Sequence, residues 1–172
     1  MVPIDGIDQS HPIVKEGYAY WLSKCHGNSL PRWSDFDPAE IKSLLPNIVV
    51  THVMDNPRDY VEKITGERVI ERSSMNSAGK NWSAIPGRGP GSKIWTVFSD
   101  IVENKQPILN RIPYVGPHLD FIDIDTVCCP ISENGETVDR IVAFIGYIRS
   151  DSNFGTSKLT QKFKNITARL RS

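Results

Sequence analysis

The sequence has no long hydrophobic run, no excess of either charge and no leader-like N-terminus. No stretch approaches the roughly 20 apolar residues that a membrane-spanning helix needs. The first ten residues, MVPIDGIDQS, carry acids and lack the apolar segment of a signal peptide. Lys and Arg total 20, as do Asp and Glu, so the net charge gives no general attraction to nucleic acid or to acidic lipid. We therefore predict a soluble, cytoplasmic protein that does not bind nucleic acid.

Cysteine and histidine are also too few and too scattered to indicate a metal or redox centre. The three cysteines, Cys25, Cys128 and Cys129, cannot all pair within the chain, which favours reduced thiols. Cys128 and Cys129 are adjacent in an expected strand, so their side chains point to opposite faces. The histidines share no metal-ligand spacing with cysteines or acids, so we predict no metal site. They are His11, His26, His52 and His118.

No cysteine lies in a setting that suits covalent flavin attachment, and haem ligation through His52 or His118 has no support beyond the residue type. The sequence therefore does not favour haem or flavin, and the identity of any cofactor stays open.

Two helices are expected before the first strand. Apolar residues at three- and four-residue spacing predict a helix over 11–25, with Ser10 as its N-cap. Asp37 and Pro38 suit the N-cap and first position of a second, short helix over 38–45. Pro46 ends that helix. We expect residues 1–46 to form an N-terminal helix followed by a rigid, proline-rich segment that leads into a sheet.

The rest of the chain predicts an α+β fold. A helical crossing is expected after the second strand, consisting of a short helix within 66–74, a glycine-rich loop and a helix capped by Ser92. Asn134-Gly135 predicts a hairpin between the last two strands. This order gives a five-stranded antiparallel sheet with a concave face closed by the central helices, in a core over 47–149. The β-branched and apolar runs place the strands at 47–54, 59–65, 108–115, 119–132 and 140–149.

Five short motifs give the sequence a family resemblance. They are YW at 20–21, LPRWSDFDP at 30–38, LLP at 44–46, KITG at 63–66 and GK at 79–80. The first three together are fairly specific, and the chain resembles a divergent PAS-type family of small stand-alone proteins common in alphaproteobacteria. The resemblance implies a PAS-like five-stranded antiparallel sheet, with central helices on one face and flanking N- and C-terminal helices. It also implies a sensory role but says little about the ligand.

Two neighbouring positions depart from the family pattern. Lys63 stands where an arginine is expected, and Glu62 stands where an aromatic residue is common. Tyr60, Glu62 and Ile64 share one face of the strand, so an inward orientation would bury the carboxylate and require a cationic partner. Candidate partners are Arg68, Arg111, His118 or a cationic group of a ligand. The alternative, which we favour, is that Glu62 lies at an exposed or frayed strand end.

A ligand pocket between the helices and the sheet is one interpretation of the aromatic residues in the core region. A filled aromatic core is the alternative. The glycine-rich loop PGRGPGSK at 86–93 is interpreted as a flexible lid, with a specific anion site as the second possibility. The ligand-pocket candidates are Tyr60, Glu62, Trp82, Trp95, Phe98, Tyr114, His118 and Phe121.

The C-terminal segment, 150–172, predicts a basic amphipathic helix. Four apolar residues fall on a stripe as narrow as a coiled-coil seam, and lysines and arginines flank it. The helix is only about two heptads long and would be marginal alone, so we expect it to dock on protein rather than on a membrane surface. The partner-binding candidates are Leu159, Phe163, Ile166 and Leu170.

Together these features predict a sensory or regulatory module for signal transduction and not an enzyme. No kinase, cyclase or DNA-binding segment follows Arg149, so output is expected through association, either as a homodimer or with a signalling protein such as a histidine kinase. One alternative is a small α+β enzyme that uses Glu62, His118 or Asp123 as acid-base groups. Another is a nucleic-acid adaptor that uses the basic tail, which the balanced charge disfavours.

Overall fold

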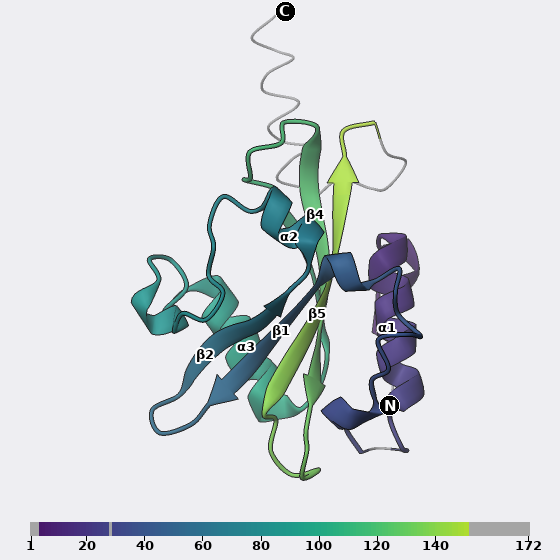
Figure 1. Cartoon of the computed structure of the whole chain (residues 1–172), viewed down its shortest axis with the longest axis vertical. Coiled ribbons are helices and arrows are strands. Elements are labelled where there is room, and N and C mark those ends of the chain that lie inside the picture. The colour runs from purple at the N-terminus through teal and green to yellow at the C-terminus, as the bar shows by residue number, and fades with distance from the viewer. Residues whose placement is uncertain (1–3, 28, 152–172) are drawn as a thin grey trace, which may run out of the picture.

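Five antiparallel strands form one sheet, as the sequence predicted, and their order in the sheet is β2-β1-β5-β4-β3 (Figure 1). The computed structural model describes residues 4–27 and 29–151, and the statements below refer to these. The first strand pair is followed by two helices, and the remaining strands complete the sheet from its far edge, β3, inward to β5 at the centre. The regular elements are α1 (Pro12–Lys24), β1 (Ile48–Met54), β2 (Asp59–Thr65), α2 (Glu67–Arg72), α3 (Lys93–Asn104), β3 (Ile108–Pro113), β4 (Phe121–Ile131) and β5 (Arg140–Arg149).

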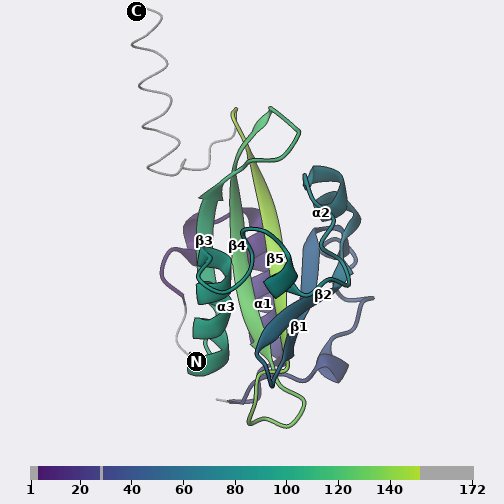
Figure 2. The same ribbon diagram turned by 90° about the vertical axis from the view of Figure 1, so that its left-hand side faces the viewer.

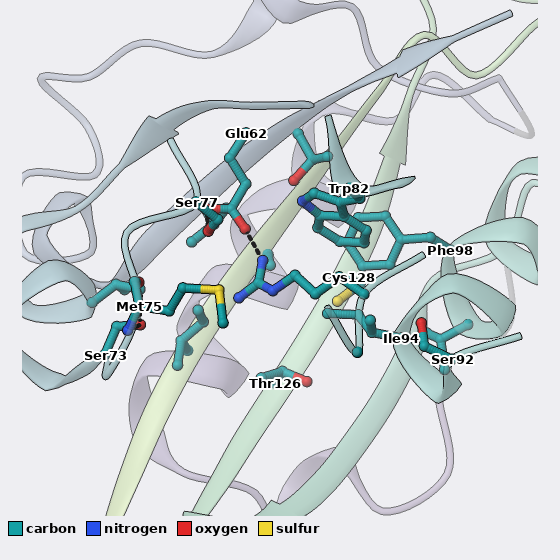
Figure 3. Close-up of a pocket in the computed structure, with 18 of the residues that line it drawn as sticks. Glu62, Ser73, Met75, Ser77, Trp82, Ser92, Ile94, Phe98, Thr126 and Cys128 are labelled. Carbon is teal, nitrogen blue, oxygen red and sulfur yellow. Dashed lines mark hydrogen bonds and ion pairs between the residues drawn. The ribbon is translucent and has the colours of Figure 1, made fainter. Parts of the chain in front are cut away.

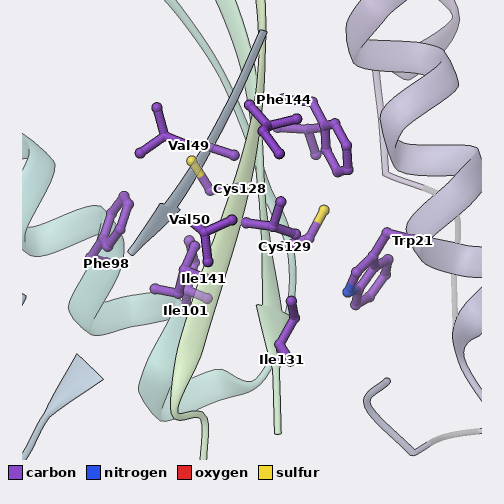
Figure 4. Close-up of a cluster of buried hydrophobic side chains, with 14 of the residues drawn as sticks. Trp21, Val49, Val50, Phe98, Ile101, Cys128, Cys129, Ile131, Ile141 and Phe144 are labelled. Carbon is purple, nitrogen blue, oxygen red and sulfur yellow. The ribbon is translucent and has the colours of Figure 1, made fainter. Parts of the chain in front are cut away.

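The sheet is covered on both faces (Figure 2). Figure 4 shows Phe98 of α3 on one side of the central strands and Trp21 of α1 on the other. Cys128 and Cys129 point to these two opposite sides, which confirms the alternation expected within β4. The face toward α2 and α3 is called the inner face below, and the face toward α1 the outer face.

Helix α1 lies directly on β5 and β4. A Cβ atom on Gly17 would come within 2.1 Å of the Phe144 ring, so only glycine allows this approach. Trp21 is fully buried, and its Nε1 donates a hydrogen bond of 2.9 Å to the Pro130 carbonyl. The outer face is therefore sealed by the chain's own first helix.

The N-cap of α1 differs from the expected Ser10. His11 holds that position, and its Nδ1 accepts a hydrogen bond from the Ile13 backbone N–H at 3.2 Å. Burial lowers the pKa of His11, which favours the neutral ring that can accept this bond. The His11 backbone N–H in turn donates to Asp125 Oδ2 at 2.8 Å, so a contact with β4 fixes where the helix begins.

The short helix expected over 38–45 does not form. The segment from Pro38 to Leu44 is a series of turns, followed by a 3₁₀ turn at Leu45–Asn47. A helix this short gains little from its own hydrogen bonds, so packing decides the backbone path. Leu44 is fully buried, and the Leu45 and Pro46 carbonyls lie where a Cβ on Gly66 would clash, at 2.4 Å. Two of the sequence motifs, LLP and KITG, thus meet in space.

The remaining expectations divide between confirmed and untested. The last three strands lie within the ranges expected, and Ser92 caps α3 by accepting a hydrogen bond from the Trp95 N–H. The described residues contain no helix long and apolar enough to cross a membrane. The predicted C-terminal helix, with Leu159, Phe163, Ile166 and Leu170, lies outside the described residues and stays a prediction, as do the segment boundaries at 46 and 150.

Candidate functional site

A cavity of about 1050 Å³ lies between the inner face of the sheet, α2, α3 and the connection between those helices (Figure 3). Ligand pockets in proteins have volumes of roughly 300–1,000 Å³, so this space can hold a small organic molecule. All five strands contribute residues to its floor, and the helices supply its walls. Its apolar lining includes Val49, Val69, Ile94, Val97, Phe98, Ala143 and Ile145.

One buried carboxylate faces this cavity. Glu62 on β2 is only 5% exposed, and its Oε2 accepts a 2.7 Å hydrogen bond from Ser77 Oγ. Its Oε1 accepts from Nη1 of Arg88, in the ion pair that Figure 3 marks with a dashed line. The Arg88 guanidinium also lies 5.3 Å from the centroid of the Trp82 ring. A charged group is thereby held inside an otherwise apolar wall.

The favoured expectation that Glu62 lies at an exposed strand end is wrong. The β1–β2 register shifts at Val50/Thr51 so that Glu62 pairs with Thr51, and both residues line the cavity. The cationic partners considered from the sequence are also wrong. Arg68 donates to Asn47, Arg111 forms an ion pair with Asp125, and the His118 ring contacts a backbone carbonyl of α2. The partner is instead Arg88, which was not among the candidates from the sequence.

The cavity wall contains polar atoms without a protein partner. In the described part of the chain, Thr51 Oγ1, Thr65 Oγ1 and Trp82 Nε1 are buried and make no hydrogen bond. All three residues line the cavity. Buried polar groups in folded proteins are nearly always satisfied by protein, water or ligand. Their concentration here indicates a site that is completed by something other than the protein.

The structure divides the aromatic candidates into two clusters. Trp82 and Phe98 line the cavity. Tyr60 packs behind them, with ring-centroid distances of 5.4 Å to each and 4.9 Å to Trp95. Tyr60 and Trp95 therefore support the wall without lining the space. A filled aromatic cluster and an open pocket exist side by side.

The second cluster lies at the far end of the inner face and includes Tyr114, His118 and Phe121. The Arg72 guanidinium stacks 4.5 Å from the Phe121 ring centroid and 4.8 Å from that of Tyr147. Tyr114 Oη donates 2.8 Å to the Arg72 carbonyl. Burial raises the pKa of Tyr147 to about 12, so its ring stays neutral beside the cation. This cluster fastens the C-terminal end of α2 to β4 and β5.

The acid-base residues of the enzyme alternative are not brought together. Glu62 lies in the cavity, His118 in the β3–β4 connection, and Asp123 on the outer face of β4, opposite to Thr126 and Cys128. The Cys128 thiol lines the cavity, but burial raises its pKa to about 12, so it stays protonated at neutral pH. No group of three or more His, Cys, Asp or Glu within the described ranges could hold a metal ion.

Ser77, Arg88 and Thr51 are three polar residues among the cavity residues that were not predicted from the sequence. Arg88 had a signal, because it is the charged residue of the loop PGRGPG, and a buried acid on the neighbouring strand requires a cation. Gly87 and Gly91 on either side adopt positive φ angles of 77° and 87°, which bend the loop back over the cavity. Ser77 and Thr51 carry no comparable signal.

Comparisons with known proteins identify the family. The family model described as the PAS domain matches residues 9–145, a range that includes α1, the cavity and the greater part of β5. No match was found among curated proteins. Among solved structures, a fungal LOV-domain photoreceptor is similar, with a TM-score of 0.39 and 15% sequence identity over 84% of this chain and 98% of that chain. Because the family model covers well over half of the sequence, this chain belongs to the PAS domain family.

Proposed function

We propose that this protein is a sensory or regulatory module in signal transduction that binds a small molecule in the cavity of its inner face. The observation that carries the proposal is the space itself, with its mainly apolar lining and its unpartnered polar atoms. A module built only to support other domains gains nothing from such a space, because unfilled volume lowers the stability of the fold. Membership of the PAS family supports the sensory role.

Helix α2 offers a route by which occupancy reaches the rest of the protein. Val69 and Ile70 of α2 line the cavity, while Arg72 at its end stacks on residues of β4 and β5. Strand β5 ends at Arg149, directly before the segment for which a basic helix is predicted. A ligand that moves α2 therefore acts on the strand that leads into the C-terminal segment. Small shifts of packed elements are a common switching mode.

Filling the cavity from its floor is expected to abolish ligand binding. Ala143 lies on the central strand β5 and lines the cavity, so Ala143→Phe places a ring in the space that a ligand would take. We expect the neutral fluorescent probe N-phenyl-1-naphthylamine to bind the full chain saturably. The substitution should raise its dissociation constant at least about tenfold. Fluorescence titration measures both values.

Ala39→Phe is the matched control, since Ala39 is exposed in the turns before β1 and does not line the cavity. It should leave probe binding unchanged. Circular dichroism of both variants checks that the sheet is intact. Equal probe binding by Ala143→Phe and the unmodified chain, or the absence of saturable binding, would contradict a ligand site in this cavity.

We further propose that output occurs by association through the terminal helices, as a homodimer or with a signalling protein such as a histidine kinase. The free thiols of Cys25, Cys128 and Cys129 support a cytoplasmic location. The predicted stripe of the C-terminal segment is the partner surface, and contact with a membrane surface is not part of the proposal. Its residues are Leu159, Phe163, Ile166 and Leu170.

Sedimentation equilibrium of the full chain is expected to give the molar mass of two chains at micromolar concentration. Phe163→Asp should shift the protein to one chain, because it places a charge in the predicted apolar stripe. Thr160→Asp introduces the same residue beside the stripe and should leave the dimer intact. A monomeric unmodified chain, or equal effects of the two substitutions, would count against the homodimer.

A further inference from the structure

The charges around the cavity are unequal. Arg88 and Lys93 are the cationic residues of the lining, and Glu62 is its acid. Lys93 is also the first residue of the twelve-residue helix α3, whose N-terminal end faces the same space. The partial positive charge of a helix N-terminus adds to that of the two side chains. Lys93 is exposed, so its charge acts at the mouth of the cavity, while Arg88 is the cation inside it and is already paired with Glu62. The balance of charge favours an anion.

The hydrogen-bonding capacity left over in the cavity is mainly that of donors. Arg88 uses only Nη1 of its side chain in bonds to the described residues, so Nε and Nη2 retain their hydrogens for another acceptor. Trp82 Nε1, a donor only, is also without a partner among these residues. Glu62 by contrast has a partner on each oxygen, Arg88 on one and Ser77 on the other. The site has room for an acceptor group rather than for a second donor.

The ion pair with Glu62 orients Arg88 for binding an acceptor group of a ligand. A guanidinium binds a carboxylate best through two parallel N–H bonds, and the Nε–Nη2 edge is one such pair of donors. Glu62 holds the remaining nitrogen, and the Trp82 ring lies against the same group at 5.3 Å. Arg88 is thereby fixed in orientation, which lowers the entropy that binding would otherwise cost. Glu62 acts as a positioning residue.

The remainder of the ligand must be apolar. The interior lining is aliphatic and aromatic, and the cavity continues to an apolar rim where Ile70, Met75 and Ile112 are 57%, 44% and 50% exposed. Such exposed side chains around a concave space indicate a surface that is covered when the ligand is bound.

From these observations we propose that the ligand is an organic anion with an apolar body, whose carboxylate binds the Nε–Nη2 edge of Arg88 while Glu62 holds Nη1. The inference rests on the proposed function and specifies the ligand class of the same cavity. A cationic ligand would meet Arg88 and Lys93, and would find both Glu62 oxygens already engaged. A neutral molecule would leave the free edge of Arg88 without an acceptor.

Three compounds with the same ten-carbon chain test the charge preference. Isothermal titration calorimetry of the full chain would compare decanoate, decanol and decylammonium, each below the concentration at which it forms micelles. Decanoate should bind about tenfold to a hundredfold more tightly than decanol, which is the range that charged hydrogen bonds give. Decylammonium should bind least.

Most of the preference should be lost with the ion pair. Arg88→Met alone leaves Glu62 buried without its partner, so Glu62→Gln/Arg88→Met is the variant of choice, because it removes both charges and keeps the side-chain lengths similar. Decanoate should then lose most of its advantage over decanol, because only Lys93 and the N-terminus of α3 remain to attract the anion. Arg58→Met removes an exposed arginine that pairs with Asp55 outside the cavity, and should preserve the preference.

The possible outcomes separate the two proposals. Equal binding of decanoate and decanol to the unmodified chain, or tighter binding of decylammonium, overturns the anion while the ligand site stands. A preference for decanoate that is undiminished in the double variant overturns the role of Arg88. Failure of all three compounds to bind overturns the anion inference, and binding of the neutral naphthylamine probe then decides whether the cavity binds ligands at all.

Discussion

Replacing Trp21 with alanine is expected to lower the free energy of unfolding by about 3–5 kcal/mol, the range for truncating a buried aromatic residue. Trp21 is fully buried between α1 and the outer face of the sheet. The change removes this packing and leaves the Pro130 carbonyl without the indole donor that now satisfies it. Urea denaturation followed by circular dichroism measures the loss.

Trp33→Ala is the matched control. The substitution is again tryptophan to alanine, but Trp33 is only half-buried. It lies in the segment before β1, where its ring stacks on that of Phe36 with 5.6 Å between the ring centroids. It should lose clearly less stability than Trp21→Ala. If the two variants lost similar amounts, α1 would not be an integral layer of this domain, and the close contact of Gly17 with Phe144 would have no energetic weight.

The strands and the long helix were accessible from the sequence because local patterns determine them. The run at β5, RIVAFIGYIR, is apolar on both faces, as a central strand covered by helices must be, and its observed bounds are those expected. Helix α3 has a Ser92 cap and a buried face that includes Phe98 and Ile101. In both segments propensity, pattern and packing agree, so a reading of local residues is sufficient.

The structure of the segment before β1 could not be predicted from local sequence patterns in the same way. Asp37, Pro38 and Glu40 satisfy the rules for a helix start, yet the backbone forms turns. Tyr20 from α1 accepts a 2.9 Å hydrogen bond from the Asp37 N–H, and Lys24 pairs with Glu40 at 2.6 Å. The Asp37 side chain does accept a 2.8 Å hydrogen bond from the Ala39 N–H, as an N-cap would, but contacts with residues 16 or 17 positions earlier hold the segment in turns. Tertiary contacts override weak local preference in so short a segment.

Only part of the candidate site could be predicted from the sequence. An inward Glu62 could be stated as a possibility from strand alternation, but its partner lies 26 residues later in an irregular loop. No periodicity connects the two, and the position of Arg88 depends on the path of the glycine-rich turns. The aromatic residues show the same limit. Trp82 and Tyr114 are equally good pocket candidates in the sequence. Only the arrangement of the strands places Trp82 in the cavity and Tyr114 in the cluster around Arg72.

Under the proposed function, the two ends of the inner face account for ligand binding and for its transmission to the rest of the sheet. At one end Arg88 attaches the loop before α3 to β2, and at the other Arg72 attaches α2 to β4 and β5. Both arginines belong to segments that also line or border the cavity. A ligand that engages Arg88 therefore acts on the connection that joins α2 to α3, and the packed sheet beneath provides the rigid reference.

Removing Arg88 alone is expected to destabilise the protein more than removing the whole ion pair. Loss of one partner of a buried pair costs about 3–5 kcal/mol, and because a quarter of the Arg88 side chain is exposed we expect about 2–3 kcal/mol for Arg88→Met. The cost arises because Glu62 is left buried with Ser77 as its remaining partner. Glu62→Gln/Arg88→Met has no buried charge at this position and should regain at least half of the loss.

Urea denaturation of the unmodified chain, the two single variants and the double variant completes a thermodynamic cycle for the pair. Strict additivity of the single losses would mean that Glu62 and Arg88 do not interact in solution, and the preorganised anion site would lose its basis. A recovery in the double variant would instead show that Glu62 constrains the loop through Arg88. Since the same arginine is proposed to bind the ligand, decanoate should stabilise the unmodified chain more than decanol does. In the double variant most of this difference between the two compounds should be lost.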